Sequence, residues 1–304
     1  IAQYFRLTIP KTPRFTLDIE HNVEQAAKDI DSYLSTGMYT VDPAAPALRV
    51  QTRRRSTPDF ISYFSRWKHF KVLFGTAYSW FVLDIAFYGL GLNSSIILSA
   101  IHVPAQSTGN PIYDNLLQVC VGNLIISLAG YIPSYWATFL LIDQWGRKSI
   151  QLMGFAVLTV LFIIMGGAFV TQNSGRGGQK ASISLLCLVN FFQNFGPNTT
   201  TFIIPGGVFP TRYRSTAHGI SAACGKLGAI LAQLTLKGLN SDLSGQNKWI
   251  RHILVIFGAL MSTGITSTYL VPETKHATLE DLSNEIPDGF TDAGMPLVPT
   301  LRSV

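Results

Sequence analysis

The chain has 304 residues, of which 47% are hydrophobic and 13% are charged, with a mean hydropathy of +0.27. Charged residues make up about 25% of soluble domains, so the composition indicates a membrane protein. The net charge of +6 lies in short connections between apolar segments, which is typical of membrane topology and argues against nucleic-acid binding. The three cysteines and six histidines show no metal-ligand spacing, so no metal or other cofactor is expected.

The N-terminal region 1–69 is mostly polar and cannot span a membrane. It predicts a partly disordered cytoplasmic loop. Its basic run, Arg53 to Arg55, is interpreted as a topology-setting cluster, with contact to anionic lipid as the alternative. Residue 1 is Ile and no signal peptide precedes the first domain, so we expect a piece of a longer protein.

Apolar segments then fill residues 70–271, and short connections between them favour an antiparallel helical bundle. None of them alternates apolar and polar residues as barrel strands do. The sequence predicts an all-α membrane protein with six transmembrane helices and a cytoplasmic tail over 272–304. The six segments are 70–101, 116–142, 150–171, 182–209, 215–237 and 250–271.

Basic residues predict the orientation of these helices. The N-terminal flank carries Arg66, Lys68 and Lys71, whereas the first connection between segments, 102–115, carries no Lys or Arg. The bias is imperfect, since the third-to-fourth and fifth-to-sixth connections also carry basic residues. The positive-inside rule favours both termini in the cytoplasm, and the even number of segments agrees.

Asp84 stands out because it lies within the first apolar segment. A carboxylate at the centre of a membrane helix costs roughly 2.5–3.5 kcal/mol on insertion scales, and such residues usually mark a substrate or proton path. Trp80 and Tyr88 lie four residues to either side, so the three side chains share one helix face. The alternative is a buried Asp satisfied by neighbouring helices.

Two short motifs lie at segment ends. Residues 143–148 read DQWGRK, in which Gly146 permits a tight turn and Asp143 and Arg147 can pair, with Lys148 beside them. Residues 271–275 read VPETK, in which a proline ends the last segment and Glu273 lies at the membrane edge. They resemble the DxxGRR/K loop and the PETK signature of the major facilitator superfamily.

A longer resemblance covers nearly the whole chain. Residues 190–226 read NFFQNFGPNTTTFIIPGGVFPTRYRSTAHGISAACGK, and residues 80–95 read WFVLDIAFYGLGLNSS. Both are similar to the plant and fungal inorganic-phosphate:proton symporters, the fungal members more closely. The resemblance matches only the second half of a twelve-helix transporter, so an N-terminal six-helix half is the missing partner.

The resemblance implies an integral plasma-membrane protein that holds inorganic phosphate near the middle of the bilayer and couples its movement to protons. The residues matching the substrate site are Trp80, Asp84, Tyr88, Asn194 and Lys226, with Asp84 also carrying the coupled proton. An ionised Asp84 accepts a hydrogen bond from protonated phosphate, whereas sulfate has no proton to give. Lys226 balances the charge, or alternatively extends to an interface.

The loop residues Asp143, Gly146, Arg147, Lys148, Arg212 and Glu273 match the gating network of these transporters. The family usually has a Glu where this chain has Gly207, which removes a carboxylate partner of the cytoplasmic arginines and puts gating in doubt. Transport of another solute, such as a sugar or an organic anion, stays open because the loop motifs are widely shared. A non-transporting receptor or regulatory membrane protein also stays open. An enzyme has little support, since the sequence has no nucleophile–base motif, metal cluster or nucleotide loop.

Overall fold

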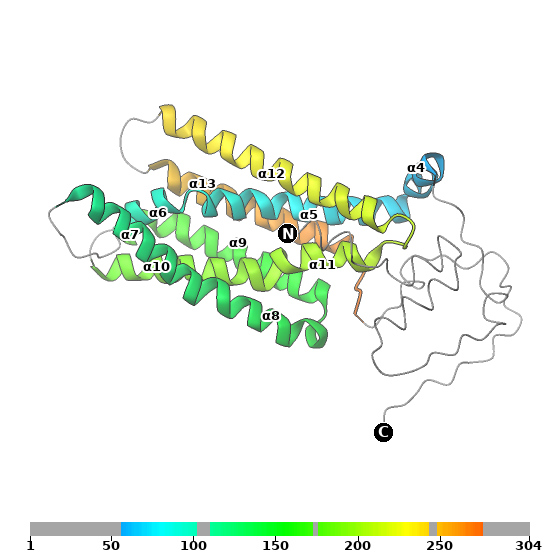
Figure 1. The fold of residues 1–304 in the computed structure, drawn as a ribbon, viewed down its shortest axis with the longest axis horizontal. Coiled ribbons are helices and arrows are strands. Elements are labelled where there is room, and N and C mark those ends of the chain that lie inside the picture. The colour runs from blue at the N-terminus through cyan, green and yellow to red at the C-terminus, as the bar shows by residue number, and fades with distance from the viewer. Residues whose placement is uncertain (1–55, 102–109, 173–175, 243–247, 276–304) are drawn as a thin grey trace, which may run out of the picture.

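The computed structural model describes residues 56–101, 110–172, 176–242 and 248–275. This part of the chain is entirely helical and contains no strand, which confirms the predicted all-α class. Its helices lie side by side along one long axis, with the ends of the described chain at the same end as α4 (Figure 1). The elements are α4 Thr57–Ser65, α5 Trp67–Gly91, α6 Ser94–Ile101, α7 Pro111–Ile126, η2 Ser127–Tyr131, α8 Ile132–Trp145, α9 Arg147–Gln172, α10 Arg176–Gln193, η3 Asn194–Asn198, α11 Thr199–Val208, α12 Arg214–Asp242 and α13 Lys248–Tyr269.

Five stretches of the described residues are long and apolar enough to cross a membrane. They correspond to five of the six expected segments. The remaining one, 182–209, is not among them, and it is divided between α10, the π-helix η3 and α11. The five stretches are Trp67–Gly91, Pro111–Trp145, Arg147–Gly167, Arg214–Leu236 and Ile250–Tyr269.

Prolines and glycines account for the breaks. At η3, Pro197 lacks an N–H to continue the helix and Gly196 leaves helical geometry, with φ −100° and ψ −111°. Pro133, at the start of α8, likewise follows directly on the π-helix η2. The expected first segment is also two helices, because the chain turns at Asn93, whose amide donates to the carbonyl of Gly89 at 3.0 Å.

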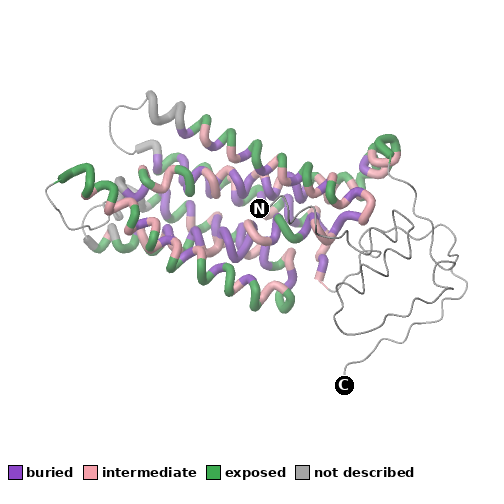
Figure 2. Tube along the Cα trace, in the orientation of Figure 1, coloured by how far each residue is buried: buried purple, intermediate pink, exposed green. Residues whose placement is uncertain are grey.

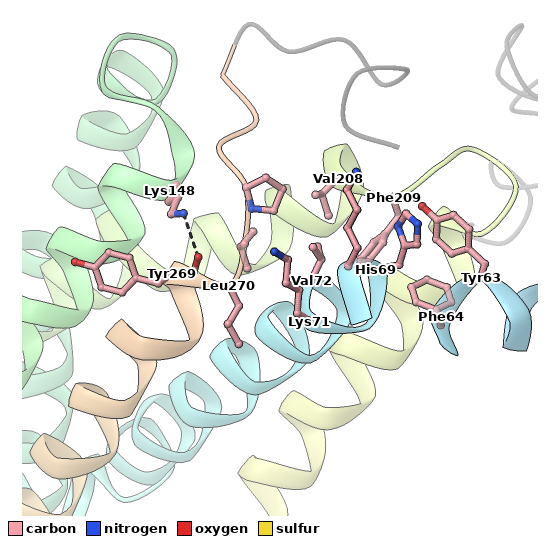
Figure 3. Close-up of a pocket in the computed structure, with 13 residues that line it drawn as sticks. Tyr63, Phe64, His69, Lys71, Val72, Lys148, Val208, Phe209, Tyr269 and Leu270 are labelled. Atoms are coloured by element: carbon pink, nitrogen blue, oxygen red, sulfur yellow. Dashed lines mark hydrogen bonds between the residues drawn. The ribbon is translucent and has the colours of Figure 1, made fainter. Parts of the chain in front are cut away.

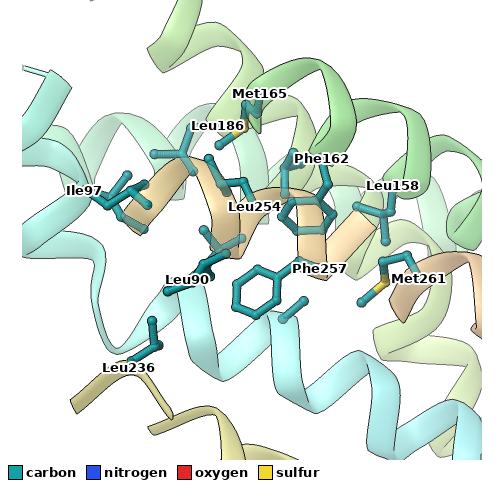
Figure 4. Close-up of a cluster of buried hydrophobic side chains, with 14 of the residues drawn as sticks. Leu90, Ile97, Leu158, Phe162, Met165, Leu186, Leu236, Leu254, Phe257 and Met261 are labelled. Atoms are coloured by element: carbon teal, nitrogen blue, oxygen red, sulfur yellow. The ribbon is translucent and has the colours of Figure 1, made fainter. Parts of the chain in front are cut away.

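Two helix pairs form the framework of the bundle, α12 against α5 and α13 against α9. A buried apolar cluster joins α5, α9, α10 and α13, and Phe162 of α9 meets Phe257 of α13 edge to face with ring centroids 5.8 Å apart (Figure 4). A second cluster, which includes Phe64, Phe209 and Tyr213, fixes α4 against the ends of α11 and α12. The prediction of a loop over residues 1–69 is therefore wrong for Thr57–Ser65, which form a packed helix.

The two edges of the bundle remain the least covered. Buried residues make up 17% of the α7–α8 span and 28% of the α12 span, compared with 44–50% of the other three. These edges lie on opposite sides in Figure 2, where exposed residues follow the outer lengths of α8 and α12. Their large apolar side chains therefore require lipid or another protein surface to cover them.

The contact of α12 with α5 depends on Gly228. A Cβ at Gly228 would lie 2.4 Å from the carbonyl oxygen of Phe81, so any larger residue forces the helices apart. We expect Gly228→Ala to destabilise the purified chain by about 1–3 kcal/mol and to lower its melting temperature in detergent. A Cβ at Gly219, on the same helix, would have no other atom within 4 Å. Gly219→Ala is the matched control and should leave stability unchanged or raise it by up to about 1 kcal/mol. Equal losses in both variants would contradict the packing argument.

Candidate functional site

The face of α5 that carries Asp84 and Tyr88 meets Lys226 of α12. Asp84 is 2% exposed, and one of its oxygens, Oδ2, lies 3.2 Å from Nζ of Lys226. The same ammonium donates to the hydroxyl of Tyr88 at 2.7 Å and lies 4.4 Å from the centre of its ring. The sequence-based residues Asp84, Tyr88 and Lys226 are therefore assembled into one polar group.

The two charges of this group are placed asymmetrically. The side chain of Asp84 is 3% exposed whereas that of Lys226 is 58% exposed. An ammonium has three hydrogens, and Asp84 and Tyr88 take two of them. The third hydrogen and the hydroxyl hydrogen of Tyr88 are available on the open side of the pair. The arrangement therefore offers donors to an anion while it keeps a carboxylate covered behind them.

Sequence reasoning missed the residues that make this contact possible. Gly225 precedes Lys226, and a Cβ there would lie 2.6 Å from Cδ1 of Trp80 and 2.8 Å from Oδ2 of Asp84. Gln233 continues the polar face, since its amide donates to the carbonyl of Tyr88 at 2.9 Å. The spacing of Gly225, Gly228 and Ala232 on one side of α12 is the signal that could have identified the tight crossing.

Trp80 lies beside the ion pair within a group of aromatic rings. Its ring centroid is 5.5 Å from that of His218 and 6.2 Å from that of Phe202. Its indole N–H makes no hydrogen bond with the part of the chain described here, although it is oriented toward the crossing at Gly225. The indole donor is therefore available to a ligand that enters next to Asp84.

Asn194 belongs to a different network. It is 1% exposed, and its amide oxygen accepts from the hydroxyl of Tyr135 at 3.0 Å and from the amide of Asn198 at 2.7 Å. Its amide nitrogen donates to the carbonyl of Asn190 at 2.8 Å. Among the described residues, no hydrogen bond joins Asn194 to Asp84 or Lys226. In this conformation Asn194 therefore belongs to the network of Tyr135, Asn198 and Asn190, with one of its two amide hydrogens used.

Gln193, the neighbour of Asn194, was not singled out by the sequence. It is fully buried, and neither its amide oxygen nor its amide nitrogen has a hydrogen-bond partner among the residues described. Unsatisfied buried amides are costly and rare. Gln193 is the last residue of α10 and directly precedes η3, the π-helix that contains Gly196 and Pro197.

The loop motifs form a latch between the start of α9 and the end of α13. The carboxylate of Glu273 accepts backbone N–H groups of Arg147 and Lys148, each at 3.2 Å, and so caps the N-terminus of α9. It also accepts the N–H groups of Thr274 and Lys275, at 2.8 and 3.0 Å. A distant segment thus satisfies donors that a helix start leaves open.

The rest of the DQWGRK motif supports this latch. Gly146 has φ +88°, which favours glycine, and a Cβ there would lie 2.8 Å from the Glu273 carboxylate. Arg147 pairs with Asp143 at 2.9 Å and donates to the carbonyl of Thr274 at 3.3 Å. Lys148 donates to the carbonyl of Tyr269 at 3.3 Å. The structure therefore brings together Asp143, Gly146, Arg147, Lys148 and Glu273.

Arg212 lies apart from this latch and binds α4. Its guanidinium donates to Asp59 at 3.0 Å and lies over the ring of Tyr213, 4.8 Å from the ring centre. The hydroxyl of Tyr213 donates to the same carboxylate. Asp59 was missed because it falls in the region predicted as loop, although Ser56 caps its backbone N–H and Pro58 occupies a helix start. Gly207 has open space around it, so its missing side chain disturbs no packing.

Glu273→Gln tests the latch. It keeps the side-chain shape but replaces an acceptor oxygen with a donor and removes the charge at the start of α9. We expect a loss of about 1–3 kcal/mol, measured as a lower melting temperature of the purified chain. The control is Asp143→Asn, whose carboxylate is 77% exposed in its pair with Arg147 and should cost under about 1 kcal/mol. A loss for Asp143→Asn as large as that for Glu273→Gln would contradict the assignment.

Comparison with known proteins places these features in a family. The family described as sugar (and other) transporter matches residues 1–286. A repressible high-affinity phosphate permease of Neurospora crassa is 44% identical over 299 residues, covering 94% of this chain and 51% of the permease. An inorganic phosphate transporter of Saccharomyces cerevisiae is also 44% identical, over 92% of this chain and 49% of that protein. The chain thus spans about half the length of these relatives and aligns with their C-terminal half.

A solved structure agrees with this placement at the level of the fold. The proton:xylose symporter XylE, a major facilitator superfamily protein, superposes with a TM-score of 0.60 at 20% identity, over 92% of this chain and 55% of the symporter. The expected resemblance to fungal and plant phosphate transporters is confirmed. The chain belongs to the sugar (and other) transporter family and has the fold of the C-terminal half of a major facilitator superfamily protein.

Proposed function

We propose that this chain is the C-terminal half of a proton-coupled inorganic phosphate transporter. The observation that carries the proposal is the pairing of a covered carboxylate, Asp84, with an ammonium, Lys226, that is 58% exposed within an apolar span. A membrane protein gains nothing by exposing an ammonium to hydrocarbon. The exposed side of this pair therefore faces a water-filled cavity, completed by an N-terminal six-helix half.

Phosphate fits the hydrogen-bonding groups at this position. Dihydrogen phosphate has bare oxygens that accept from Lys226, from the hydroxyl of Tyr88 and from the indole of Trp80, and its own hydroxyl donates to Asp84. Protonation of Asp84 would remove the negative charge that attracts Lys226 and so weaken their 3.2 Å contact. Proton binding and anion binding therefore act on the same contact. We include Asn194 as a further substrate residue that joins after the exchange of a bond to Tyr135 or Asn198.

The latch supplies the proposed gate. Its two bonds from the backbone N–H groups of Arg147 and Lys148 to Glu273 hold the start of α9 at the end of α13, and Arg212 holds α4 against the start of α12. Release of these contacts would let the start of α9 move relative to the end of α13, and α4 move relative to the start of α12. We assign this end to the cytoplasm, with both termini, in a plasma-membrane protein surrounded by the lipid bilayer.

Transport of another solute, a sugar or an organic anion, is the second candidate. It is favoured by the family description and by the fold shared with a xylose symporter. The charge pair favours an anion that also carries a donor hydrogen, which a neutral sugar is not. A non-transporting receptor half is the remaining alternative, because Gly207 stands where the phosphate symporters usually have a Glu. Uptake assays with phosphate, sulfate and xylose as competing solutes separate the three.

Asp84→Asn, in a complete transporter formed with an N-terminal half, is the direct test. The amide keeps the shape but cannot ionise, and we expect loss of proton-driven phosphate uptake in liposomes with normal folding and insertion. Trp80→Phe and Tyr88→Phe each remove one donor and should weaken phosphate binding by about 1–3 kcal/mol. Thr235→Val, at an exposed position of α12, is the control. Normal uptake and normal pH dependence in Asp84→Asn would refute the proposed role.

The orientation is testable with single cysteines placed after Cys120, Cys187 and Cys224 are replaced by serine. Gln144→Cys reports the latch end and Ile112→Cys the opposite end, and both positions are exposed. In sealed cells we expect an impermeant maleimide to label position 112 and to leave position 144 unlabelled until the cells are opened. Labelling of position 144 from outside would contradict the proposed orientation. Separately, a fluorescent fusion that localises to internal membranes would exclude the plasma membrane.

A further inference from the structure

A cavity of about 260 Å³ lies at the latch end of the bundle, away from Asp84. It is formed where α4, the starts of α5 and α9 and the ends of α11 and α13 converge (Figure 3). Its volume is near the lower end of small-molecule pockets, which run from roughly 300 to 1,000 Å³. It shares Lys148 with the latch but contains neither Asp84 nor Lys226, so its chemistry calls for a separate explanation.

The polar lining of the cavity is basic. Lys68, His69 and Lys71 come from the first turns of α5, and Lys148 comes from the start of α9. None of the residues that line the cavity is acidic. Figure 3 shows Lys71 and Lys148 on two sides of the same opening, with the carbonyl of Tyr269 accepting from Lys148. Several cationic groups thus surround one space from different helices.

The cationic charge of the lining is not neutralised by the described residues. Lys68 and Lys71 make no ion pair or hydrogen bond with the residues the structure describes, and Lys148 uses one of its three hydrogens. The nearby carboxylates are committed elsewhere, because Glu273 accepts four backbone N–H groups and Asp59 is bound by Arg212 and Tyr213. The cavity is therefore an attractive position for an anion with several acceptor oxygens.

The position of the cavity along the helices indicates where that anion comes from. It lies at the ends of three candidate spans, Trp67–Gly91, Arg147–Gly167 and Ile250–Tyr269. Trp67 and Tyr269, the terminal residues of two of them, are 68% and 66% exposed. Exposed aromatic residues at the ends of spans lie at the level of lipid head groups. Basic pockets between helices at that level suit anionic head groups.

We propose that this cavity binds the phosphate group of an anionic lipid of the phosphoinositide class, with Lys68, Lys71 and Lys148 as its ligands. A phosphate monoester has enough oxygens to bind the lysines together. The acyl chains of the lipid would then lie along the exposed apolar side chains of Phe70 and Phe74. Because these lysines belong to α5 and α9, a bound head group would join the two helices at the latch end.

The test uses the purified 304-residue chain in detergent and follows its melting temperature. The probes are dioctanoyl phosphatidylinositol 4-phosphate, dioctanoyl phosphatidylcholine, inositol 1,4-bisphosphate and inorganic phosphate. We expect a saturable rise in melting temperature with the phosphoinositide and none with phosphatidylcholine. We expect the two soluble phosphates to need at least roughly tenfold higher concentrations for a half-maximal response, which corresponds to 1.4 kcal/mol. Equal responses to inositol bisphosphate and to the lipid would assign the site to soluble phosphate esters and overturn the lipid source.

Variants then locate the response. Lys68→Gln/Lys71→Gln should weaken the phosphoinositide response at least roughly tenfold, whereas Lys68→Arg/Lys71→Arg should preserve it. The charge-matched control is Lys180→Gln/Arg251→Gln, at exposed positions outside the cavity, and should respond normally. If the double glutamine variant does not fold, Lys68→Gln alone, at an exposed position, gives the same comparison.

Three further outcomes would overturn the proposal. The first is no response to any probe, and the second is an unchanged response in the folded lysine variants. The third concerns the C-terminal segment 276–304, which follows directly on the cavity and carries Glu280, Asp281, Glu285, Asp288 and Asp292 against a single Arg302. If only a chain ending at residue 275 responds, that acidic segment occupies the cavity in the intact protein.

Discussion

The structure depends on the constraint that Asp84 imposes. A carboxylate in the middle of an apolar span is tolerated only when a cation and hydrogen-bond donors reach it. Lys226 reaches it because α12 crosses α5 at Gly225 and Gly228, where no side chain separates the backbones. The polar contacts of Tyr88 and Gln233 extend the same crossing. The tightest helix pair in the bundle is thus also the pair that carries the charges.

The breaks in the helices have a complementary consequence. Pro197 and Gly196 divide the path from α10 to α11 within the buried part of the bundle. The polar side chains next to that break, Asn194 and Thr199, satisfy local amide and carbonyl groups. Gln193 remains unsatisfied among the described residues. The regular spans form the framework of the bundle, whereas the irregular span places buried polar side chains next to non-helical backbone. In transporters, non-helical backbone at membrane depth usually lies where it is buried in protein or lines a cavity.

Much of this arrangement follows from local sequence, and the remainder from contacts that no local pattern encodes. Segment length and hydropathy located the spans, and helical spacing placed Trp80, Asp84 and Tyr88 on one face. The resemblance to the phosphate symporters singled out Lys226, and charge balance suggested that it pairs with Asp84. The partner of Arg212 could not be found in this way, because Asp59 is 153 residues distant and lies in a polar region. The capping of α9 by Glu273 is likewise a pairing across 126 residues.

Asn194 shows a different limit. Its position in a resemblance suggested substrate binding, but its amide is occupied by Tyr135, Asn198 and Asn190 in this conformation. A motif identifies a residue type at a position, whereas the hydrogen bonds available to it depend on which state of the protein is present. Under the proposed function, the bonds of Asn194 would differ between the alternating states of the transporter.

Helix α5 connects the Asp84–Lys226 pair with the latch end of the bundle. Lys68 and Lys71 occupy its first turns, and Asp84 lies about four turns further along the same uninterrupted helix. A helix of that length moves as a rigid element, so a shift at its start displaces the carboxylate at its centre. α12 has the same organisation, since Arg212 is held just before its start and Lys226 lies in its interior. Contacts at the latch end therefore bias the geometry of the Asp84–Lys226 pair without touching it, through the two helices that cross there.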